Sequence, residues 1–286
     1  MRILVFGKTG QVATELARQA DVIALGRDQA DLSDPSACAA AIRAHAPEAV
    51  INAAAYTGVD KAEEEEDLAT TINGAAPAAM AAVCADLGIP FVHISTDYVF
   101  DGSGEAARGP DAPTAPLGAY GRSKLAGETG IVAAGGAFAI LRTSWVVSAH
   151  GANFVKTMLR VGPARGHLRV VDDQIGGPTP AGDIAAACLT IAAHLAEHPE
   201  AAGIYHFAGA PDTSWAGFAE AIFEMAELAV AVEHIPTTEY PLPAPRPLNS
   251  RLDCSRTEAV FGIPRPEWRA GLAEILNDLS RQGGTS

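Results

Sequence analysis

The sequence predicts an α/β fold, a doubly wound parallel β-sheet followed by a smaller α/β unit from the C-terminal half. In the first half of the chain, short runs of β-branched and aromatic residues alternate with segments rich in Ala and Leu. This alternation is typical of βαβ units, whose right-handed crossovers cover both faces of a parallel sheet with helices. After about residue 145 the alternation loosens, and Gly and Pro gather at 176–178 and 241–247.

Five apolar runs are short enough for strands and lie between turn-forming residues, so each is expected to be a strand. They are residues 3–6, 22–25, 49–52, 91–95 and 138–142. The segments between them are rich in helix formers and are expected to be helices. They are residues 10–18, 35–46, 68–87 and 120–134. A last helix is expected near the C-terminus, where an apolar stripe at helical spacing indicates core packing. The stripe is formed by Trp268, Leu272, Ile275, Leu276 and Leu279.

Composition narrows the classes of function. The 286 residues include 20 Lys and Arg against 34 Asp and Glu, which gives a formal net charge of −14. Because non-specific binding to DNA or RNA needs a basic face, this balance argues against a nucleic-acid partner. With 48% hydrophobic and 19% charged residues the chain is expected to be globular. The acidic run 63–67 is expected to be a solvated helix face.

Cysteine spacing and apolar segments indicate the compartment. Cys38, Cys84, Cys188 and Cys254 are far apart and form no Cys-x-x-Cys pair, so they are expected to be reduced core thiols. The apolar run at residues 3–6 is shorter than the roughly 7–15 residues of a signal-peptide core. The protein is therefore expected to be cytoplasmic and to have no membrane partner.

A glycine-rich turn follows the first expected strand and begins the first helix. In this context Gly7 allows the tight turn, Gly10 lets the backbone approach a pyrophosphate, and Ala13 takes the position where helix and strand pack closely. Thr9, Gln11 and Val12 belong to the same turn. The motif predicts a Rossmann-type dinucleotide site, with residues 1–150 as the NAD(P)-binding domain. Residues 151–286 would then form mainly a substrate-binding cap, with some segments returning to the first domain.

The end of the second expected strand bears on the choice of cofactor. NAD enzymes often carry an acid at this place for the ribose hydroxyls, whereas this chain reads Leu25-Gly26-Arg27-Asp28. Arg27 can pair with a 2′-phosphate, which predicts a preference for NADPH. Asp28 leaves the use of NADH open.

Thr96, at the end of the fourth strand, and Tyr120 with Lys124 form the expected catalytic set. Tyr120 and Lys124 are four residues apart and share a helix face. A lysine ammonium beside a phenol is expected to lower the phenol pKa from about 10, so that Tyr120 exchanges a proton near neutral pH. Thr96 is expected to hydrogen-bond the same reacting oxygen.

With these motifs the sequence resembles the extended short-chain dehydrogenase/reductase family, and within it the dTDP-4-dehydrorhamnose reductases. The resemblance runs from residue 1 to about residue 280. It rests on Gly7-Lys8-Thr9-Gly10-Gln11, Asn52-Ala53-Ala54-Ala55, Ser95-Thr96-Asp97-Tyr98-Val99-Phe100, Arg142-Thr143-Ser144-Trp145, Asp173-Gln174 and Arg246-Pro247-Leu248-Asn249-Ser250-Arg251-Leu252.

The resemblance implies reduction of the 4-keto group of dTDP-4-dehydro-β-L-rhamnose to dTDP-L-rhamnose. Tyr120 would donate the proton, Lys124 would hold the nicotinamide ribose, Thr96 would orient the carbonyl, and Trp145 would face the deoxysugar. The further residues that it implies at the cofactor are Asp31, Leu32, Ala53, Ala54 and Ala55. The further candidates for the nucleotide-sugar are Asn153, Lys156, Gln174, Arg246, Asn249 and Arg251.

Some members of this family dimerise through Mg²⁺ held by an early glutamate, which corresponds to Glu15, and by later acids. Here the second ligand position is Gly182, and only Asp183 is nearby. The sequence thus argues against a bound metal and leaves monomer and homodimer open.

Two other functions remain open from the residues. An epimerase or a related nucleotide-sugar enzyme would share the fold and the Tyr-Lys pair, but a dehydratase usually needs Asp-Glu after the threonine, where this chain has Asp97-Tyr98. A non-catalytic regulatory subunit would not need Thr96, Tyr120 and Lys124 intact.

Overall fold

The computed structural model describes residues 1–283, and its centre is a six-stranded parallel sheet. The strand order is β10-β5-β4-β3-β1-β2. The strands are β1 (Ile3–Phe6), β2 (Val22–Leu25), β3 (Ala49–Asn52), β4 (Phe91–Thr96), β5 (Phe138–Thr143) and β10 (Gly203–His206). The expected fold class is confirmed. The sequence missed β10, which comes from the second half of the chain and pairs with β5.

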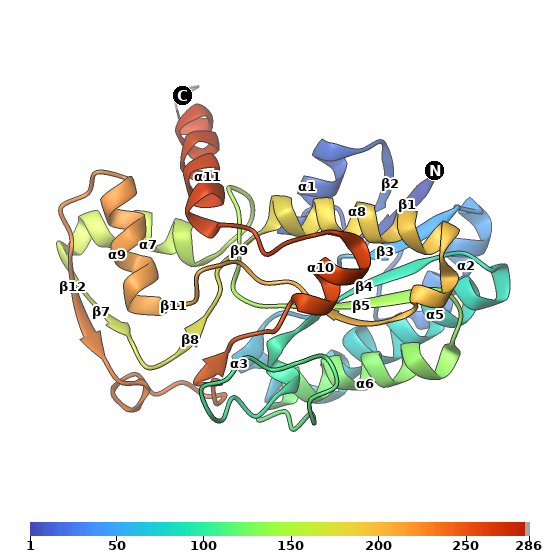
Figure 1. Cartoon of the computed structure of the whole chain (residues 1–286), viewed down its shortest axis with the longest axis horizontal. Coiled ribbons are helices and arrows are strands. Elements are labelled where there is room, and N and C mark those ends of the chain that lie inside the picture. The colour runs from blue at the N-terminus through green and yellow to red at the C-terminus, as the bar shows by residue number, and fades with distance from the viewer. Residues whose placement is uncertain (284–286) are drawn as a thin grey trace.

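Helices cover both faces of this sheet (Figure 1). On one face lie α1 (Gln11–Gln19), α8 (Ala181–Glu197) and α10 (Ser255–Phe261). On the other lie α2 (Pro35–His45), α5 (Ala76–Leu87) and α6 (Ala119–Ala134). The shorter helical pieces are α3 (Val59–Ala62), α4 (Glu66–Thr70), η1 (Thr71–Ala75), η2 (Asp97–Val99), η3 (Pro199–Ala201) and η4 (Thr237–Glu239).

The second lobe lies at the left of Figure 1 and has its own core. It is built around α7 (Phe154–Arg165), α9 (Trp215–Met225) and the parallel pair β7 (His167–Val171) and β12 (Ala231–Ile235). The remaining strands are β6 (Val146–Val147), β8 (Ile175–Gly176), β9 (Thr179–Pro180), β11 (Thr213–Ser214) and β13 (Asn249–Ser250). The last helix, α11 (Trp268–Gly283), buries Trp268, Leu272 and Ile275 in this core. Three elements from the second half of the chain, α8, β10 and α10, pack on the main sheet. A division into a cofactor-binding domain (1–150) and a cap (151–286) therefore stays a prediction.

The run from Glu66 to Leu87 is one continuous helical segment that contains a π-helical turn, η1. It is long and apolar enough to cross a membrane by length and composition alone, but 56% of its apolar window is buried within the protein. It packs between α2 and α6. We therefore interpret it as a core helix. The π turn directs the buried Asn73 side chain toward Tyr56 and Ser123, which ties this helix to α6.

The acidic run 63–67 does more than face solvent, which corrects the sequence interpretation. Glu63 accepts a hydrogen bond from the backbone N–H of Ala119 at 2.8 Å, at the start of α6. Glu66 binds the guanidinium of Arg122 with both oxygens, at 2.7 and 2.8 Å. A carboxylate at a helix N-terminus is stabilised by the free N–H groups and the helix dipole. These contacts position the helix that carries Tyr120.

Candidate active site

A cavity of about 1480 Å³ opens at the carboxyl ends of the parallel strands. It lies where the sheet order reverses between β1 and β3, the place where open α/β sheets bind ligands. Its volume exceeds the roughly 300–1,000 Å³ of a site for one drug-sized ligand, so two ligands can lie side by side. Of the residues expected from the sequence, the following line it: Gly7, Thr9, Gly10, Gln11, Val12, Arg27, Asp31, Leu32, Ala53, Ala54, Ala55, Thr96, Tyr120, Lys124 and Trp145.

The glycine-rich turn forms one wall of this cavity. Gly7 has φ +113°, a conformation that residues with a Cβ rarely adopt, and a Cβ there would lie 3.3 Å from the backbone of Ala53. Gly10 precedes α1 and gives its first turn no side-chain cap, so N–H groups of that turn remain available to a ligand. Free N–H groups at a positive helix end suit a pyrophosphate. The turn thus fits a dinucleotide.

Two cations lie in the cavity wall near the end of β2. Arg27 is exposed, with a 3.5 Å ion pair between its Nε and the carboxylate of Asp31. Lys8 also lines this part of the cavity. Sequence reasoning assigned no role to Lys8, although it belongs to the glycine motif. Hydrogen bonds donated by Ser33, together with the charge of Arg27, lower the pKa of the Asp31 carboxyl. A phosphate placed here would meet Arg27 and Lys8, with Asp31 as the opposing charge.

Tyr120 lies in the first turn of α6, which approaches η2 closely. The approach depends on Gly121, because a Cβ there would lie 2.2 Å from the carbonyl oxygen of Tyr98. The Tyr120 ring meets the ring of Tyr98 edge to face, with centroids 5.5 Å apart. The hydroxyl of Thr96, the last residue of β4, donates to Oδ1 of Asp97 at 3.1 Å and lowers the pKa of the neighbouring Tyr120 phenol. Strand end and helix start thus place a hydroxyl and a phenol side by side in the cavity wall.

The electrostatics of Tyr120 differ from the sequence expectation. Burial raises the pKa of its phenol to about 12, the charge of Asp97 acts in the same direction, and the hydrogen bond with Thr96 opposes them. This direction is opposite to the lowering of the pKa that was expected from Lys124. At neutral pH the phenol keeps its proton. This is the form that a proton donor needs.

Lys124 lies one turn after Tyr120 and is 2% exposed. Its amine contacts the carbonyl oxygen of Ile94 at 2.6 Å and Nε2 of His93 at 3.1 Å, both on β4. Burial lowers the pKa of Lys124 to about 8, and the charge of Glu128 opposes the shift. The spacing of Tyr120 and Lys124 could not predict the contact with His93, because it depends on which strand lies beneath α6.

Two buried oxygens in the cavity wall have no hydrogen-bond partner, Oδ2 of Asp97 and Oγ1 of Thr143. Burial raises the pKa of Asp97 to about 6, although hydrogen bonds from Ser250 and Thr96 oppose the shift. Buried polar atoms are nearly always hydrogen-bonded. These two therefore indicate a polar ligand that donates hydrogen bonds here. The sequence places Asp97 in the motif after β4 but gives no indication that its carboxylate binds a ligand.

An aromatic pair joins the two lobes across the cavity. Trp145, in the loop after β5, stacks on Trp215 at the start of α9, with ring centroids 3.6 Å apart and planes 12° apart. Trp145 has φ +47°, an uncommon conformation for a large side chain and one that is found at ligand sites. No spacing in the sequence marks Trp215, because its contact with Trp145 joins segments about 70 residues apart.

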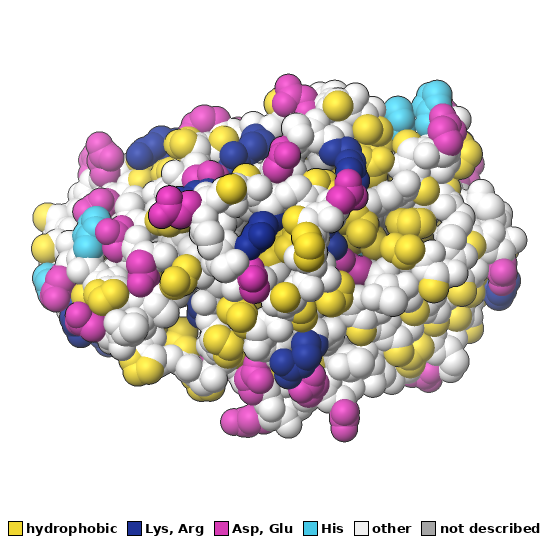
Figure 2. Space-filling model, turned by 60° about the horizontal axis from the view of Figure 1, so that its bottom comes forward, with side chains coloured by type: hydrophobic (Ala, Val, Ile, Leu, Met, Phe, Trp, Pro, Cys, Tyr) yellow, Lys and Arg dark blue, Asp and Glu magenta, His cyan; other side chains and the backbone are white. Residues whose placement is uncertain are grey.

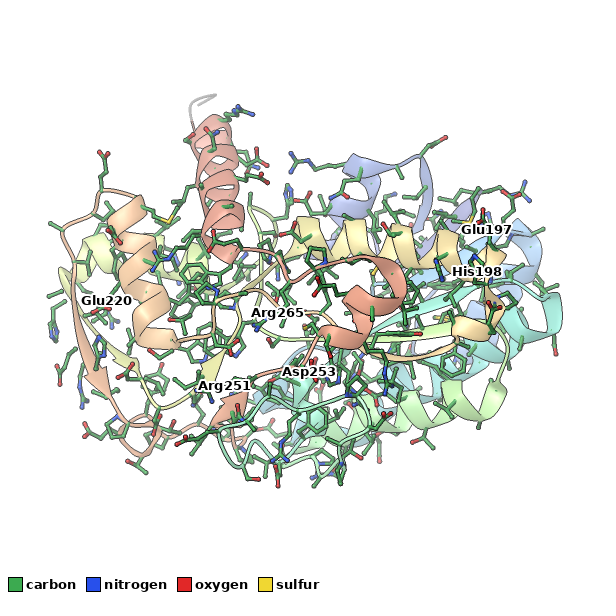
Figure 3. The ribbon with its side chains drawn as sticks, in the orientation of Figure 1. Glu197, His198, Glu220, Arg251, Asp253 and Arg265 are labelled. Carbon is green, nitrogen blue, oxygen red and sulfur yellow. The ribbon has the colours of Figure 1, made fainter. Side chains whose placement is uncertain are left out.

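Six side chains expected at the nucleotide-sugar do not line this cavity. They are Asn153, Lys156, Gln174, Arg246, Asn249 and Arg251. Arg246 pairs with Asp60 at 2.8 Å. Arg251 lies between the lobes in Figure 3 and donates to Oδ1 of Asn249 at 3.1 Å.

The other three also have partners within the chain. Asn153 caps α7 and donates to Oε1 of Gln11 at 2.9 Å. Lys156 donates to the carbonyl oxygen of Ala149, and Gln174 donates to Thr237. The part of all six in substrate binding stays a prediction.

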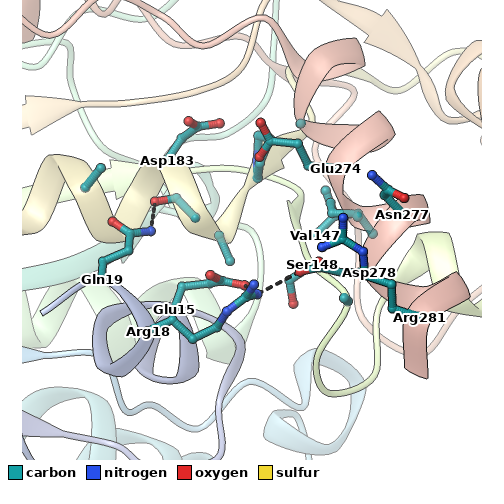
Figure 4. A pocket seen from close by; sticks show the side chains of 17 residues that line it. Glu15, Arg18, Gln19, Val147, Ser148, Asp183, Glu274, Asn277, Asp278 and Arg281 are labelled. Atoms are coloured by element: carbon teal, nitrogen blue, oxygen red, sulfur yellow. Dashed lines mark hydrogen bonds and ion pairs between the residues drawn. The ribbon is translucent and has the colours of Figure 1, made fainter. Parts of the chain in front are cut away.

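A second, smaller cavity of about 390 Å³ lies between α1, α8 and α11 (Figure 4). Glu15 and Asp183 both line it. Glu15 pairs with Arg18 at 3.2 Å, and Arg18 also binds Asp278 at 2.8 Å. Within residues 1–283, no group of three or more His, Cys, Asp or Glu side chains is arranged to hold a metal ion.

Known proteins are similar to this chain over nearly its full length. The family model described as the RmlD substrate binding domain matches residues 1–281. A dTDP-4-dehydrorhamnose reductase of Sinorhizobium fredii is 43% identical over 99% of both chains. That of Escherichia coli K12 is 40% identical over 98% of both.

Solved structures agree. A dTDP-4-dehydrorhamnose reductase from Bacillus anthracis, solved in complex with NADP, has a TM-score of 0.89 and 32% identity, and the match covers 97% of this chain and 99% of that one. A dTDP-4-dehydrorhamnose reductase from Clostridium acetobutylicum has a TM-score of 0.91 and 35% identity, and the match covers 98% of this chain and 100% of that one. The chain therefore belongs to the family of the RmlD substrate binding domain.

Proposed function

We propose that this protein reduces the 4-keto group of dTDP-4-dehydro-β-L-rhamnose to give dTDP-L-rhamnose, with NADPH as the reductant. One observation carries the proposal. Thr96, Tyr120 and Lys124 line the same cavity as the glycine-rich turn, in a chain 43% identical over its length to a reductase named for this reaction.

The cofactor would lie along the carboxyl ends of β1, β2 and β3. The turn from Gly7 to Val12 would hold the pyrophosphate, and Arg27 the 2′-phosphate. Asp31 and Leu32 would border the adenine, and residues 53–55 would line the cofactor after β3. When bound, NADPH supplies the hydride that reduces the carbonyl carbon.

The side chains at the substrate carbonyl bind and protonate its oxygen. Thr96 donates a hydrogen bond that orients this oxygen, and Tyr120 transfers its phenolic proton to it as negative charge develops there. Because burial raises the pKa of Tyr120 to about 12, the proton is in place at neutral pH. Lys124, which lines the same cavity, would hold the nicotinamide ribose.

The cap would complete the site for the sugar. Trp145, held flat by its stack on Trp215, offers an apolar face to the 6-deoxy part of the sugar. The unpaired Oδ2 of Asp97 is an acceptor for a sugar hydroxyl. Arg246, Asn249 and Arg251, with Asn153, Lys156 and Gln174, would act on the nucleotide side of the substrate.

We further propose that the protein acts in the cytoplasm on a small-molecule nucleotide-sugar, as a monomer or homodimer, without nucleic acid or membrane as a partner. Figure 2 shows acidic and basic side chains interspersed on one face of the molecule. The net charge of −14 makes a polyanionic partner unfavourable. Glu274 and Asp278 line the same small cavity as Glu15 and Asp183, and within the described residues these acids form no group arranged to hold a metal ion.

The identity of the substrate is tested by following NADPH oxidation with the 4-keto-6-deoxy sugar carried on dTDP, on UDP or on GDP. We expect one NADPH consumed per sugar, with the highest kcat/KM on dTDP. Conversion of the sugar without net loss of NADPH would favour an epimerase. Binding of NADPH without reduction of any of the three sugars would favour a regulatory subunit.

Arg27 provides a prediction about the cofactor. In Arg27→Ala, we expect the ratio of kcat/KM for NADPH to that for NADH to fall about tenfold or more, because one charge-assisted contact to the 2′-phosphate is worth about 1.5–3 kcal/mol. Titration calorimetry with each cofactor should give the same change in Kd. The control is Arg43→Ala, which removes a surface ion pair between Arg43, near the C-terminal end of α2, and Asp86 of α5. An unchanged ratio would remove Arg27 from the cofactor site.

A further inference from the structure

The side chain of Gln11 connects the glycine-rich turn to the segment that leads into the second lobe. Gln11 is the first residue of α1. Its Nε2 donates to the carbonyl oxygen of Val146 at 3.3 Å. Its Oε1 accepts from Oγ of Ser148 at 3.0 Å and from Nδ2 of Asn153 at 2.9 Å. All three partners lie on residues 144–153, where the chain passes from β5 of the main sheet to α7 of the second lobe.

Backbone groups fix the orientation of the Gln11 amide. The backbone N–H of Lys156 donates to Oδ1 of Asn153 at 3.1 Å, so the NH₂ group of Asn153 is the part that faces Gln11. An NH₂ group only donates, and it therefore needs the oxygen of Gln11 opposite it. The NH₂ group of Gln11 then faces the carbonyl oxygen of Val146, which only accepts. Rotating the Gln11 amide would set donor against donor and acceptor against acceptor.

These contacts hold the backbone next to Trp145. The φ of +47° at Trp145 is uncommon for a large side chain, and such conformations persist where surrounding contacts fix them. The carbonyl oxygen of Trp145 accepts from the backbone N–H of Thr179 at 3.0 Å. The next carbonyl oxygen, that of Val146, accepts from Gln11. The Trp145 ring, stacked on Trp215, lines the cavity. Gln11 thus fixes the backbone that aims this ring.

The backbone and the side chain of Gln11 serve different places. Its backbone N–H belongs to the first turn of α1, where N–H groups have no partner within the helix and suit a pyrophosphate. Both polar atoms of its side chain already have partners on residues 144–153. Two of these partners, Ser148 and Asn153, do not line the active-site cavity. Binding of the cofactor therefore needs the backbone of Gln11 and not its side chain.

We propose that Gln11 is a positioning residue, whose side chain sets the place of Trp145 at the sugar while its backbone serves the cofactor. The proposal deepens the proposed function and rests on it for the role of Trp145. Hydride transfer needs the sugar and the nicotinamide in a defined relative position. Because one residue contacts both the cofactor turn and the segment that carries Trp145, it fixes one wall of the site relative to the other.

The test compares two glutamines of the same helix. Gln11→Met keeps the length and the approximate volume of the side chain and removes its donor and its acceptor. The matched control is Gln19→Met. Gln19 lies at the other end of α1 (Figure 4), and its Nε2 also donates to a carbonyl oxygen of the second half of the chain, that of Gly182, at 2.9 Å. It does not line the active-site cavity.

Steady-state kinetics and calorimetry separate the sugar from the cofactor. In Gln11→Met we expect kcat/KM for the 4-keto-6-deoxy sugar on dTDP to fall about tenfold. The fall should come mostly from a higher KM, because Trp145 faces a part of the sugar that does not react. The Kd of NADPH should change little, since the backbone N–H groups remain. Gln19→Met should match wild type in all three quantities.

The position of Trp145 has a direct readout, because the chain contains three tryptophans, Trp145, Trp215 and Trp268. In protein labelled with 5-fluorotryptophan, each gives a ¹⁹F signal, and Trp145→Phe assigns the signal of interest. We expect Gln11→Met to shift or split the Trp145 signal by more than its line width and to leave that of Trp268 in place. Gln19→Met should leave both signals in place. This measurement uses protein without ligands, so it remains valid if the substrate proves to be another sugar.

Two results would overturn the proposal. One is a Trp145 signal in Gln11→Met that coincides with that of wild type. The other is a loss of activity in Gln11→Met that follows a higher Kd of NADPH while the KM of the sugar stays unchanged, which would make the side chain a cofactor ligand. If Gln11→Met fails to fold, Ser148→Ala removes one of the contacts from outside the cavity, and the same two criteria apply.

The proposed function can fail separately. A wild-type protein that reduces none of the keto-sugars would overturn the proposed function, whereas the ¹⁹F signal of Trp145 would still decide whether Gln11 positions this ring.

Discussion

Replacing Tyr120 with phenylalanine is expected to lower kcat for reduction of the keto-sugar by about 10²- to 10⁴-fold, the usual contribution of a positioned proton donor. The ring itself would remain, including its edge-to-face contact with Tyr98 at 5.5 Å. The Kd of NADPH should therefore change little. Steady-state kinetics and calorimetry on the same preparation separate the two quantities.

The matched control is Tyr205→Phe. Tyr205 is also buried and also uses its hydroxyl, which donates to the carbonyl oxygen of Ala201 at 2.5 Å, but it lies outside the cavity of the candidate site. We expect its kcat to match that of wild type. Full turnover in Tyr120→Phe would show that another group or water delivers the proton.

The second large effect concerns stability and lies directly beneath the site. Arg142 of β5 and Glu128 of α6 form an ion pair at 2.6 Å, with side chains 2% and 3% exposed. In Glu128→Gln the guanidinium would stay buried without its counter-charge. We expect the free energy of unfolding to fall by about 3–5 kcal/mol, a large share of the roughly 5–15 kcal/mol typical of a folded domain. Urea denaturation followed by circular dichroism measures it.

A surface ion pair of the same helix provides the control. Arg122 of α6 pairs with Glu66 at 2.7 Å, but these side chains are 45% and 42% exposed. Glu66→Gln should therefore cost only about 0–1 kcal/mol. Equal losses in the two variants would mean that burial does not determine the contribution of the Arg142 pair.

The sequence predicts the first half of the sheet well because its strands are short apolar runs between turn residues. Strands β1, β2 and β3 begin and end where their runs do. It could not predict β10, because Gly203–His206 has only four residues and two of them, Tyr205 and His206, carry polar groups. Its pairing with β5 depends on tertiary contacts that the local sequence does not encode. The second lobe was expected only in outline, because its strands are as short as two residues.

The candidate site divides in the same way. The cofactor side follows from motifs at strand ends, and Tyr120 follows from its spacing to Lys124 at the start of α6. The protonation states do not follow from spacing, because the partner of Lys124 is His93 on another element. The residues expected to bind the nucleotide of the substrate were the hardest to place from the sequence. Arg246, for example, pairs with Asp60, 186 residues away in the sequence.

The central claim is that Tyr120 and Thr96 protonate and orient a sugar carbonyl while a nicotinamide delivers the hydride. Its most direct test supplies the enzyme with NADPH deuterated at the transferred position, together with the 4-keto-6-deoxy sugar carried on dTDP, and follows the product by NMR. We expect one deuterium at C4 of the sugar for each NADPH oxidised, and almost none in the same time with Tyr120→Phe. A product without deuterium, formed while the cofactor stays unconsumed, would contradict it.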